Sequence, residues 1–310
     1  MHVSFWAWAL FGFLVLSALA LDLGLFRTSR SEPRELTLRS AASRSAAWIA
    51  LSLVFGLGVL LYGQHAALTY LTAYLLEKSL SVDNIFVFVL IFSELRIPPA
   101  RQRSVLLWGV LGALVMRALL IAAGLFVLNR FHWVVYPFAA LIILAAVRLL
   151  WGRQKERELV VAACSICTTW VARLIPITSQ FYGNRFWVRQ SGRLVATPLL
   201  VALIIVETTD VVFALDSVPA VLAVTREPFL VYTSNIFAML GLRSLYFVLA
   251  EIVERLRYLR VGLAAILVFF GGRLLLSDVL EVPTAVSLSV IAGALVLSVA
   301  ASIKWPAVRG

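Results

Sequence analysis

Long stretches of apolar residues, separated by short connections that carry charges and prolines, follow one another along almost the whole chain. A membrane helix needs about 20 such residues, and on that measure the pattern predicts nine spans. They lie near residues 4–26, 46–63, 68–95, 105–128, 131–151, 197–222, 229–251, 259–278 and 284–304. Because the stretches are apolar all round and do not alternate with polar positions, they do not fit a membrane β-barrel. We therefore expect an all-α, polytopic membrane protein that forms one transmembrane domain over residues 1–310.

Composition strengthens this interpretation. Of the 310 residues, 62% are hydrophobic and only 14% are charged, and the mean hydropathy is +0.97, which excludes a cytosolic enzyme and a disordered scaffold. The two cysteines and three histidines are too few for a disulfide framework or a zinc or copper cage. Any ligand chemistry must therefore rest mainly on oxygen atoms.

The formal net charge of +11 would suggest a nucleic-acid partner in a soluble protein, but here it follows the membrane topology. Alternate connections hold 21 of the 27 basic residues, as the positive-inside rule requires of cytoplasmic loops. This bias places the N-terminus outside and the C-terminus in the cytoplasm. We expect the lipid bilayer and no nucleic acid among the partners.

The longest connection, residues 152–196, is expected to be cytoplasmic. Its apolar part, 159–176, is long enough to suggest a tenth span, but that span would invert everything downstream against the arginine bias. An interfacial or re-entrant helix fits better. Cys164 and Cys167 lie in this part with the spacing of a redox or metal pair, and we interpret them as two small buried residues without chemistry.

Six acidic residues fall inside or near the spans, where each costs about 2.5–3.5 kcal/mol if it is ionised and unpaired. They are Asp22, Glu77, Asp83, Glu207, Asp210 and Asp216. Once the basic residues near the span ends, Arg148, Arg260 and Arg273 among them, are counted with the connections, only three remain inside the spans, Lys78, Arg117 and Arg243. Protons, water or a bound cation must therefore balance the remaining charge, and oxygen ligands favour magnesium, calcium or manganese. Two alternatives stay open, namely ion pairs that only hold helices together and a proton relay without metal.

The acidic residues also repeat. Glu77 and Asp83 have the same six-residue separation as Asp210 and Asp216, and an amide or hydroxyl residue follows each pair. Spans three to five and six to eight then form two inverted three-helix repeats, an arrangement that commonly holds a transport site at the membrane midplane. A separation of six residues is about 120° round a helix, so one straight helix does not aim both acids at one point. We expect Pro219 to break the sixth span and turn Asp216 inward.

Three motifs carry a resemblance to a known family. Residues 77–86 (EKSLSVDNIF), 207–220 (ETTDVVFALDSVPA) and 233–243 (TSNIFAMLGLR) resemble the signature stretches of TerC family integral membrane proteins, most closely the Alx-like branch. The resemblance runs from about residue 20 to residue 300. It departs from the family pattern at 155–180, which is more apolar here and carries the two cysteines.

The resemblance implies export of manganese across the bacterial inner membrane, with Mn²⁺ as the transported substrate and with no cofactor. Calcium is expected less than manganese. By the same resemblance the acidic site residues are Glu77, Asp83, Glu207, Asp210 and Asp216. Asn84 and Asn235 would supply neutral oxygen ligands, and Asp22 would be a further acidic site residue. Protons would enter the emptied carboxylates and reset the carrier.

The sequence leaves two other functions open. One is an exporter of an amino acid on the same superfamily fold, in which the acids clasp an ammonium group. The other is a membrane partner that carries no solute and helps to assemble or metallate other proteins. A homo-oligomer or other membrane proteins are further partners that the sequence leaves open. An enzyme is not expected, because no nucleophile and base or phosphate loop accompanies the acids.

Overall fold

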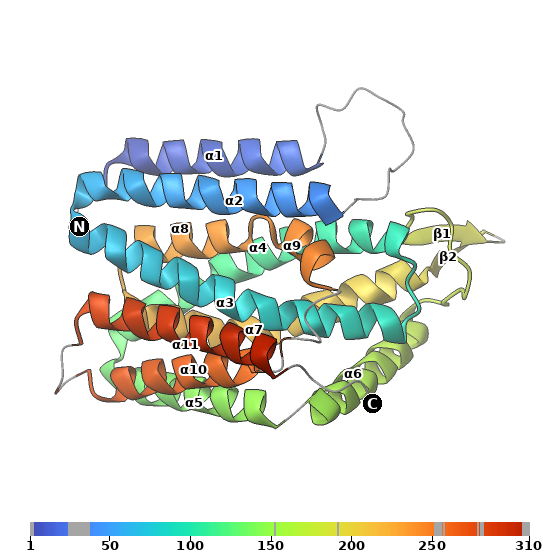
Figure 1. The fold of residues 1–310 in the computed structure, drawn as a ribbon. Coiled ribbons are helices and arrows are strands. Elements are labelled where there is room, and N and C mark those ends of the chain that lie inside the picture. Colours follow the sequence, from blue (N-terminus) through green and yellow to red (C-terminus); the bar gives the residue numbers. More distant parts are fainter. Residues whose placement is uncertain are drawn as a thin grey trace.

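The computed structural model describes residues 3–23, 38–151, 153–190, 192–250, 256, 258–277, 279 and 282–305. Within these ranges the chain forms a bundle of long helices (Figure 1). Its helices are α1 (Phe5–Leu23), α2 (Leu38–Val59), α3 (Gln64–Glu94), α4 (Pro99–Arg130), α5 (Val135–Leu150), α7 (Pro198–Val224), α8 (Pro228–Met239), α9 (Leu242–Leu249), α10 (Leu259–Leu275) and α11 (Thr284–Lys304). Helix α6 (Arg153–Leu174) and the strands β1 (Trp187–Gln190) and β2 (Arg193–Ala196) connect α5 to α7. The predicted all-α class is confirmed.

In the described ranges, five helical stretches are long and apolar enough to cross a membrane. They are Leu38–Tyr62, Pro99–Arg130, His132–Leu150, Pro198–Val224 and Thr284–Lys304. The other predicted spans coincide with helices that fall short of this measure. The apolar part of α1, Phe5–Ala20, is too short, α10 has 17 residues, α8 has 12, and α3 carries several charges. The count of nine spans therefore stays a prediction.

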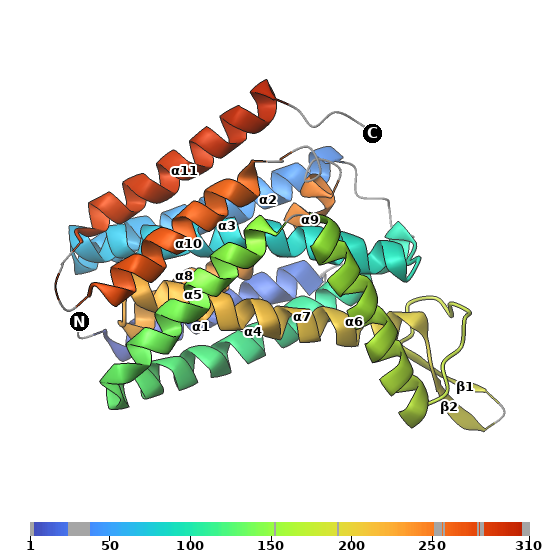
Figure 2. The ribbon, with the colours of Figure 1, turned by 90° about the horizontal axis from the view of Figure 1, so that it is seen from below.

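The helices lie in three layers (Figure 1). Helices α1 and α2 form one outer layer, and α5, α10 and α11 form the opposite one, while α3, α4, α7, α8 and α9 lie between them. Figure 2 shows α5, α10 and α11 following one another across their face of the bundle.

The packing has the exchange pattern that two inverted repeats predict. Helix α3 packs on α8 and α4 packs on α7, while α3 contacts α7 and α5 contacts α10. In the proposed repeats, α3 corresponds to α7, α4 to the α8–α9 pair, and α5 to α10. Exchanging corresponding helices turns the α3–α8 contact into the α7–α4 contact, and it leaves the α3–α7 and α5–α10 contacts unchanged. The end of α3 and the beginning of α7 both lie at the hairpin end of the bundle, so these two helices run in opposite directions (Figure 1).

The break in the second repeat is not where the sequence placed it. Helix α7 continues through Pro219, and the expected break there is wrong. The proline removes one intrahelical hydrogen bond, but α7 packs against α3, α4, α5 and α10, which hold the helix on both sides of it. Instead the predicted span 229–251 is divided, because α8 ends at Met239 and α9 begins at Leu242. Gly241 sits in this break with a φ of 83°, a left-handed conformation that favours glycine.

The connection 152–196 contains the expected helix, α6, and a hairpin that the sequence did not reveal. The strands are antiparallel, with Trp187 opposite Ala196 and Gln190 opposite Arg193. One side of α6 packs against the bundle through Val160, Cys164 and Val171. Its other side exposes large apolar residues, among them Leu159, Ile166 and Trp170. This two-sided character fits an interfacial helix, and contact with lipid stays a prediction.

Two apolar clusters fill the bundle at different levels. One contains Leu76 of α3 and packs α5 against α10, and the other begins at Ile85 of α3 and continues toward the hairpin. The polar residues of the middle layer lie where these two clusters meet, which places them away from both ends of the bundle.

Candidate functional site

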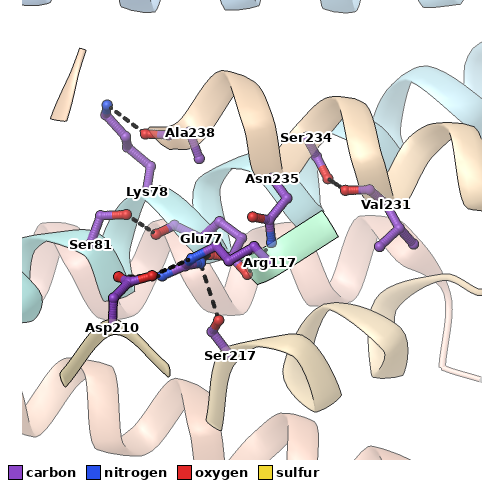
Figure 3. Close-up of polar contacts among 10 residues, drawn as sticks. All are labelled: Glu77, Lys78, Ser81, Arg117, Asp210, Ser217, Val231, Ser234, Asn235 and Ala238. Carbon is purple, nitrogen blue, oxygen red and sulfur yellow. Dashed lines mark hydrogen bonds and ion pairs between the residues drawn. The ribbon is translucent and has the colours of Figure 1, made fainter. Parts of the chain in front are cut away.

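A buried guanidinium lies at the centre of the middle layer (Figure 3). Arg117 of α4 donates from Nη1 to Oε2 of Glu77 at 2.7 Å and to Oγ of Ser217 at 3.2 Å. Its Nε and Nη2 face the two carboxylate oxygens of Asp210 at 3.4 and 3.5 Å. All four residues are at most 3% exposed. We call Glu77, Arg117, Asp210, Ser217 and Asn235 the central cluster.

Asn235 of α8 completes the central cluster and leaves one atom unsatisfied. Its Nδ2 donates to Oε1 of Glu77 at 2.7 Å, and this bond fixes the orientation of the amide, since the reverse orientation would set two oxygens against each other. Its Oδ1 is the one buried side-chain polar atom without a hydrogen-bond partner in the described part of the chain. A buried, unpaired acceptor costs about 1–3 kcal/mol, so this oxygen is a candidate ligand atom.

The central cluster holds more negative than positive charge. Glu77 and Asp210 face a single guanidinium among their described contacts, so one negative charge is left over if both carboxyls are ionised. In an apolar interior a proton or a bound cation must balance that charge. The residues come from α3, α4, α7 and α8, so both repeats contribute.

A cavity of about 50 Å³ opens beside the central cluster. Its polar lining includes Asp83, Asn84, Asp216 and Ser217, so two of the predicted acids and one predicted amide lie here. Ser217 lies on the border, because it lines the cavity and also accepts the hydrogen bond from Arg117. Asp83 follows Glu77 by six residues of a continuous α3, about 9 Å along the axis, and faces this cavity.

Two arginines enter this cavity. Arg260 of α10 contacts Asp83 at 3.1 Å through Nε and also Glu156 of α6 through Nη2. Arg148 of α5 lies 3.8 Å from Asp216. The sequence had counted both arginines with the cytoplasmic connections, and the structure places their side chains at the acids. Their positions inside the predicted spans 131–151 and 259–278 were the signal that would have identified them.

A second, wider hollow of about 740 Å³ lies at the other end of the bundle. It is lined by the start of α3, the end of α7 and the start of α8, with polar residues that include His65, Thr69 and Glu227. We call it the vestibule. The central cluster thus lies between the cavity and the vestibule along α3.

The predicted acids therefore do not meet at one point. Glu207 makes none of the hydrogen bonds of the central cluster and does not line the cavity. It is half-buried against α4, with its carboxylate so close to Gly112 that a Cβ at that position would clash with it. The side chain of Asp22 lies outside the described residues. No group of three or more acidic, histidine or cysteine side chains at metal-holding distances occurs in the part of the chain that the structure describes. Because α3 and α7 are continuous, acids six residues apart face different sides of each helix.

The three predicted counter-charges also differ. Arg117 lies between Glu77 and Asp210. Lys78 instead donates to the carbonyl oxygen of Ala238 at 3.1 Å, near the end of α8, where a positive charge compensates unpaired helix carbonyls. Arg243 is buried at the start of α9.

Known proteins resemble this chain over nearly its whole length. The family model described as "Integral membrane protein TerC family" matches residues 62–308. "Uncharacterized membrane protein STKORF319" of Myxococcus xanthus is 49% identical over 96% of this chain and 91% of its own. Alx of Escherichia coli K12, provisionally named a membrane-bound redox modulator, is 40% identical over 93% of this chain and 91% of its own. A membrane protein of Rickettsia bellii is 34% identical over 96% of this chain and 97% of its own.

No solved structure matches the chain. The family model and the length of the alignments agree with the resemblance carried by the acidic motifs, and this protein belongs to the TerC family of integral membrane proteins.

Proposed function

We propose that this protein is a secondary transporter that exports Mn²⁺ across the bacterial inner membrane. Protons return through the same carboxylates, and the metal moves between the two inverted repeats. It is a carrier in this proposal and has no catalytic role. The acids of the central cluster and of the cavity are two successive stations on the path.

The observation that carries the proposal is the central cluster itself. It combines a surplus of buried carboxylate with the unpaired Oδ1 of Asn235, and Ser217 joins it to a cavity that contains two further acids. Carboxylate and amide oxygens are ligands that Mn²⁺ accepts, whereas zinc and copper prefer nitrogen and sulfur. A cavity of about 50 Å³ with a polar lining suits a cation with a few water molecules.

Exchange for protons follows from the burial of the acids. A carboxylate that has released its metal into the vestibule is left uncompensated in an apolar surrounding, where charge is costly. Taking up a proton removes that charge and lets the empty carrier return. Each transport cycle then moves metal outward and protons inward.

The space beside the acids also separates this proposal from its nearest alternative. A cavity of this size favours a metal ion over an amino acid, which needs room for a side chain as well as for its two charged groups. The amino-acid exporter therefore predicts a larger binding space beside these acids than the cavity provides. Competition between Mn²⁺ and amino acids for uptake separates the two directly.

The name of the Alx relatives raises a redox role, which would require reactive thiols. The chain has two cysteines, and both lie on α6. Burial raises the pKa of the Cys164 thiol to about 11, the opposite of what a reactive cysteine shows. We therefore do not extend that name to this protein.

The test is Mn²⁺ uptake into proteoliposomes of the purified protein under an imposed proton gradient. Glu77→Gln keeps the size of the side chain and removes a carboxylate from the central cluster, so we expect uptake to fall at least about tenfold. Asp216→Asn in the cavity should have the same effect. Glu94→Gln, an exposed change on the same helix α3, should leave uptake unchanged.

Membrane insertion of each variant is checked by its yield and its size-exclusion profile in detergent. Wild-type vesicles that take up an amino acid but no Mn²⁺ would favour the exporter of organic solutes. Wild-type vesicles that move neither solute would favour the partner without transport. Equal Mn²⁺ uptake by wild type and Glu77→Gln would show that the central cluster is not the site.

A further inference from the structure

Arg260 is held in the cavity by contacts on three sides. Its guanidinium contacts Asp83 of α3, Glu156 of α6 and, at 4.5 Å from the ring centroid, Phe86. Its side chain is 11% exposed, and so is that of Asp83. The two carboxylates lie on different helices, so Arg260 has two ion-pair partners.

Arg148 makes the second such contact, and it is held less firmly. Its Nη1 lies 3.8 Å from Oδ2 of Asp216, and its side chain is 39% exposed. The ring of Phe213 lies 6.0 Å from its guanidinium carbon, at the far limit of a cation–π contact. The side chain reaches Asp216 from the end of α5, and Glu156 lines the same cavity and interacts with it electrostatically.

Three acidic and three basic side chains line the cavity, namely Asp83, Glu156, Asp216, Arg148, Lys155 and Arg260. Among them, Asp83 and Asp216 carry two negative charges when ionised, and the two guanidinium groups that contact them carry two positive charges. One divalent cation supplies the same total. A monovalent cation, or an amino acid without net charge, would leave carboxylate charge uncompensated in the cavity.

We propose that Arg260 and Arg148 are built-in counter-cations that occupy Asp83 and Asp216 while the cavity holds no metal, and that an entering divalent cation displaces both. Glu156 is the alternative partner that receives Arg260 when it leaves Asp83. This inference rests on the proposed function and adds to it a basis for selecting divalent ions. It also gives α6 a role, since that helix supplies the acceptor for the displaced arginine.

The proposal predicts that two substitutions within the same group of ion pairs shift the KM for Mn²⁺ in opposite directions. Arg260→Gln removes the cation that competes with Mn²⁺ for Asp83, so the KM for Mn²⁺ should fall by about threefold or more. Glu156→Gln removes the alternative acceptor and leaves Arg260 to Asp83 alone, so KM should rise by about threefold or more. Arg148→Gln should lower KM, as Arg260→Gln does.

A purely structural role for the same contacts gives a different result. Breaking a structural ion pair from either side would lower the yield or the turnover, and it would not shift KM in opposite directions. The sign of the shift is therefore the informative measurement.

The experiment measures initial rates of uptake into proteoliposomes over a range of Mn²⁺ concentrations, with kcat and KM obtained separately for each variant. Arg157→Gln and Glu158→Gln are the controls, because both residues are exposed on α6 beside Glu156. Their KM should equal that of wild type. Arg148, the more exposed of the two arginines, provides the test should Arg260→Gln fail to fold.

Opposite shifts in KM for Arg260→Gln and Glu156→Gln, or a lower KM for Arg148→Gln where Arg260→Gln does not fold, support the proposal. Shifts in the same direction, or no shift, overturn it while Mn²⁺ export by the wild type stands. Absence of Mn²⁺ transport by the wild type is a separate result, which overturns the proposed function and this inference together.

Discussion

Asn235 shows what one atom contributes to the central cluster. Its Nδ2 holds Glu77 in place, while its Oδ1 is buried and unpaired, an arrangement that only a ligand or a bound water would satisfy. We expect Asn235→Leu, which keeps the volume and removes both groups, to weaken Mn²⁺ binding about tenfold or more.

The control is its neighbour. Ser234 is equally buried, but its hydroxyl donates to the carbonyl of Val231 on the same helix and points away from the cluster (Figure 3). Ser234→Ala should therefore bind Mn²⁺ like wild type. Binding is measured on purified protein from the decrease of the paramagnetic resonance signal of free Mn²⁺. Equal losses of Mn²⁺ affinity in the two variants would mean that this part of α8 contributes packing and no metal ligand.

The two cysteines lead to a prediction about reactivity. A pKa of about 11 for Cys164 leaves roughly one thiolate in ten thousand at neutral pH. Because the thiol is protonated below its pKa, alkylation of Cys164 should be slow at neutral pH and should accelerate as the pH rises toward 11. Mass spectrometry of peptides from α6 measures the rate.

The same environment predicts that replacing both cysteines does not impair transport. We expect Cys164→Ala with Cys167→Ala to export Mn²⁺ at the wild-type rate, measured in proteoliposomes. A loss of transport in this double variant, with normal yield, would bring a redox function of α6 back into consideration.

Among the elements, the break between α8 and α9 depends on one glycine. Gly241 has a φ of 83°, and a Cβ there would lie 2.7 Å from the ring of Trp48. Gly241→Ala should therefore destabilise the protein by about 1–3 kcal/mol, seen as a lower Tm in detergent. Gly272→Ala in α10 is the matched control, since no atom lies within 4 Å of its Cβ position and alanine favours helix. If both variants melt alike, the break does not depend on the conformation of Gly241.

The helices also show which parts of the fold the sequence predicts and which it does not. Apolar runs identified the helices, because a membrane span must be long and continuous. The break at Gly241 was missed because Pro219 is the stronger local signal, and local signals do not reveal which neighbours hold a helix. The close approach of Trp48 from α2 to Gly241 is a contact that no local pattern contains.

The candidate site, too, could be predicted from the sequence only in part. The repeated spacing of the acids, and the free-energy cost of placing their charge in a membrane, identified them as candidate site residues. Their division between the central cluster and the cavity depends on α3 and α7 remaining continuous, which the sequence did not establish. Glu156 was missed because α6 comes back to the bundle through Arg260, a contact 104 residues away along the chain.

At the scale of the whole molecule, the arginine bias predicts which end of the bundle faces the cytoplasm. Gln64 is exposed at the start of α3, and Arg189 is exposed in the hairpin at the other end. In a protein without its native cysteines, a membrane-impermeant maleimide should label Gln64→Cys in spheroplasts. It should label Arg189→Cys only after the membrane is opened. Labelling in the reverse order would invert the orientation and turn the proposed exporter into an importer.

The arrangement of cavity, central cluster and vestibule determines how the membrane voltage acts on transport. Where water fills the cavity and the vestibule it carries the potential of each side inward, and we then expect most of the voltage to drop across the central cluster between them. A charge that crosses this layer against 100 mV requires about 2.3 kcal/mol. One Mn²⁺ leaving for two entering protons moves no net charge, and its rate should not respond to voltage. One Mn²⁺ leaving for a single proton moves one charge and would slow as the cell interior becomes more negative.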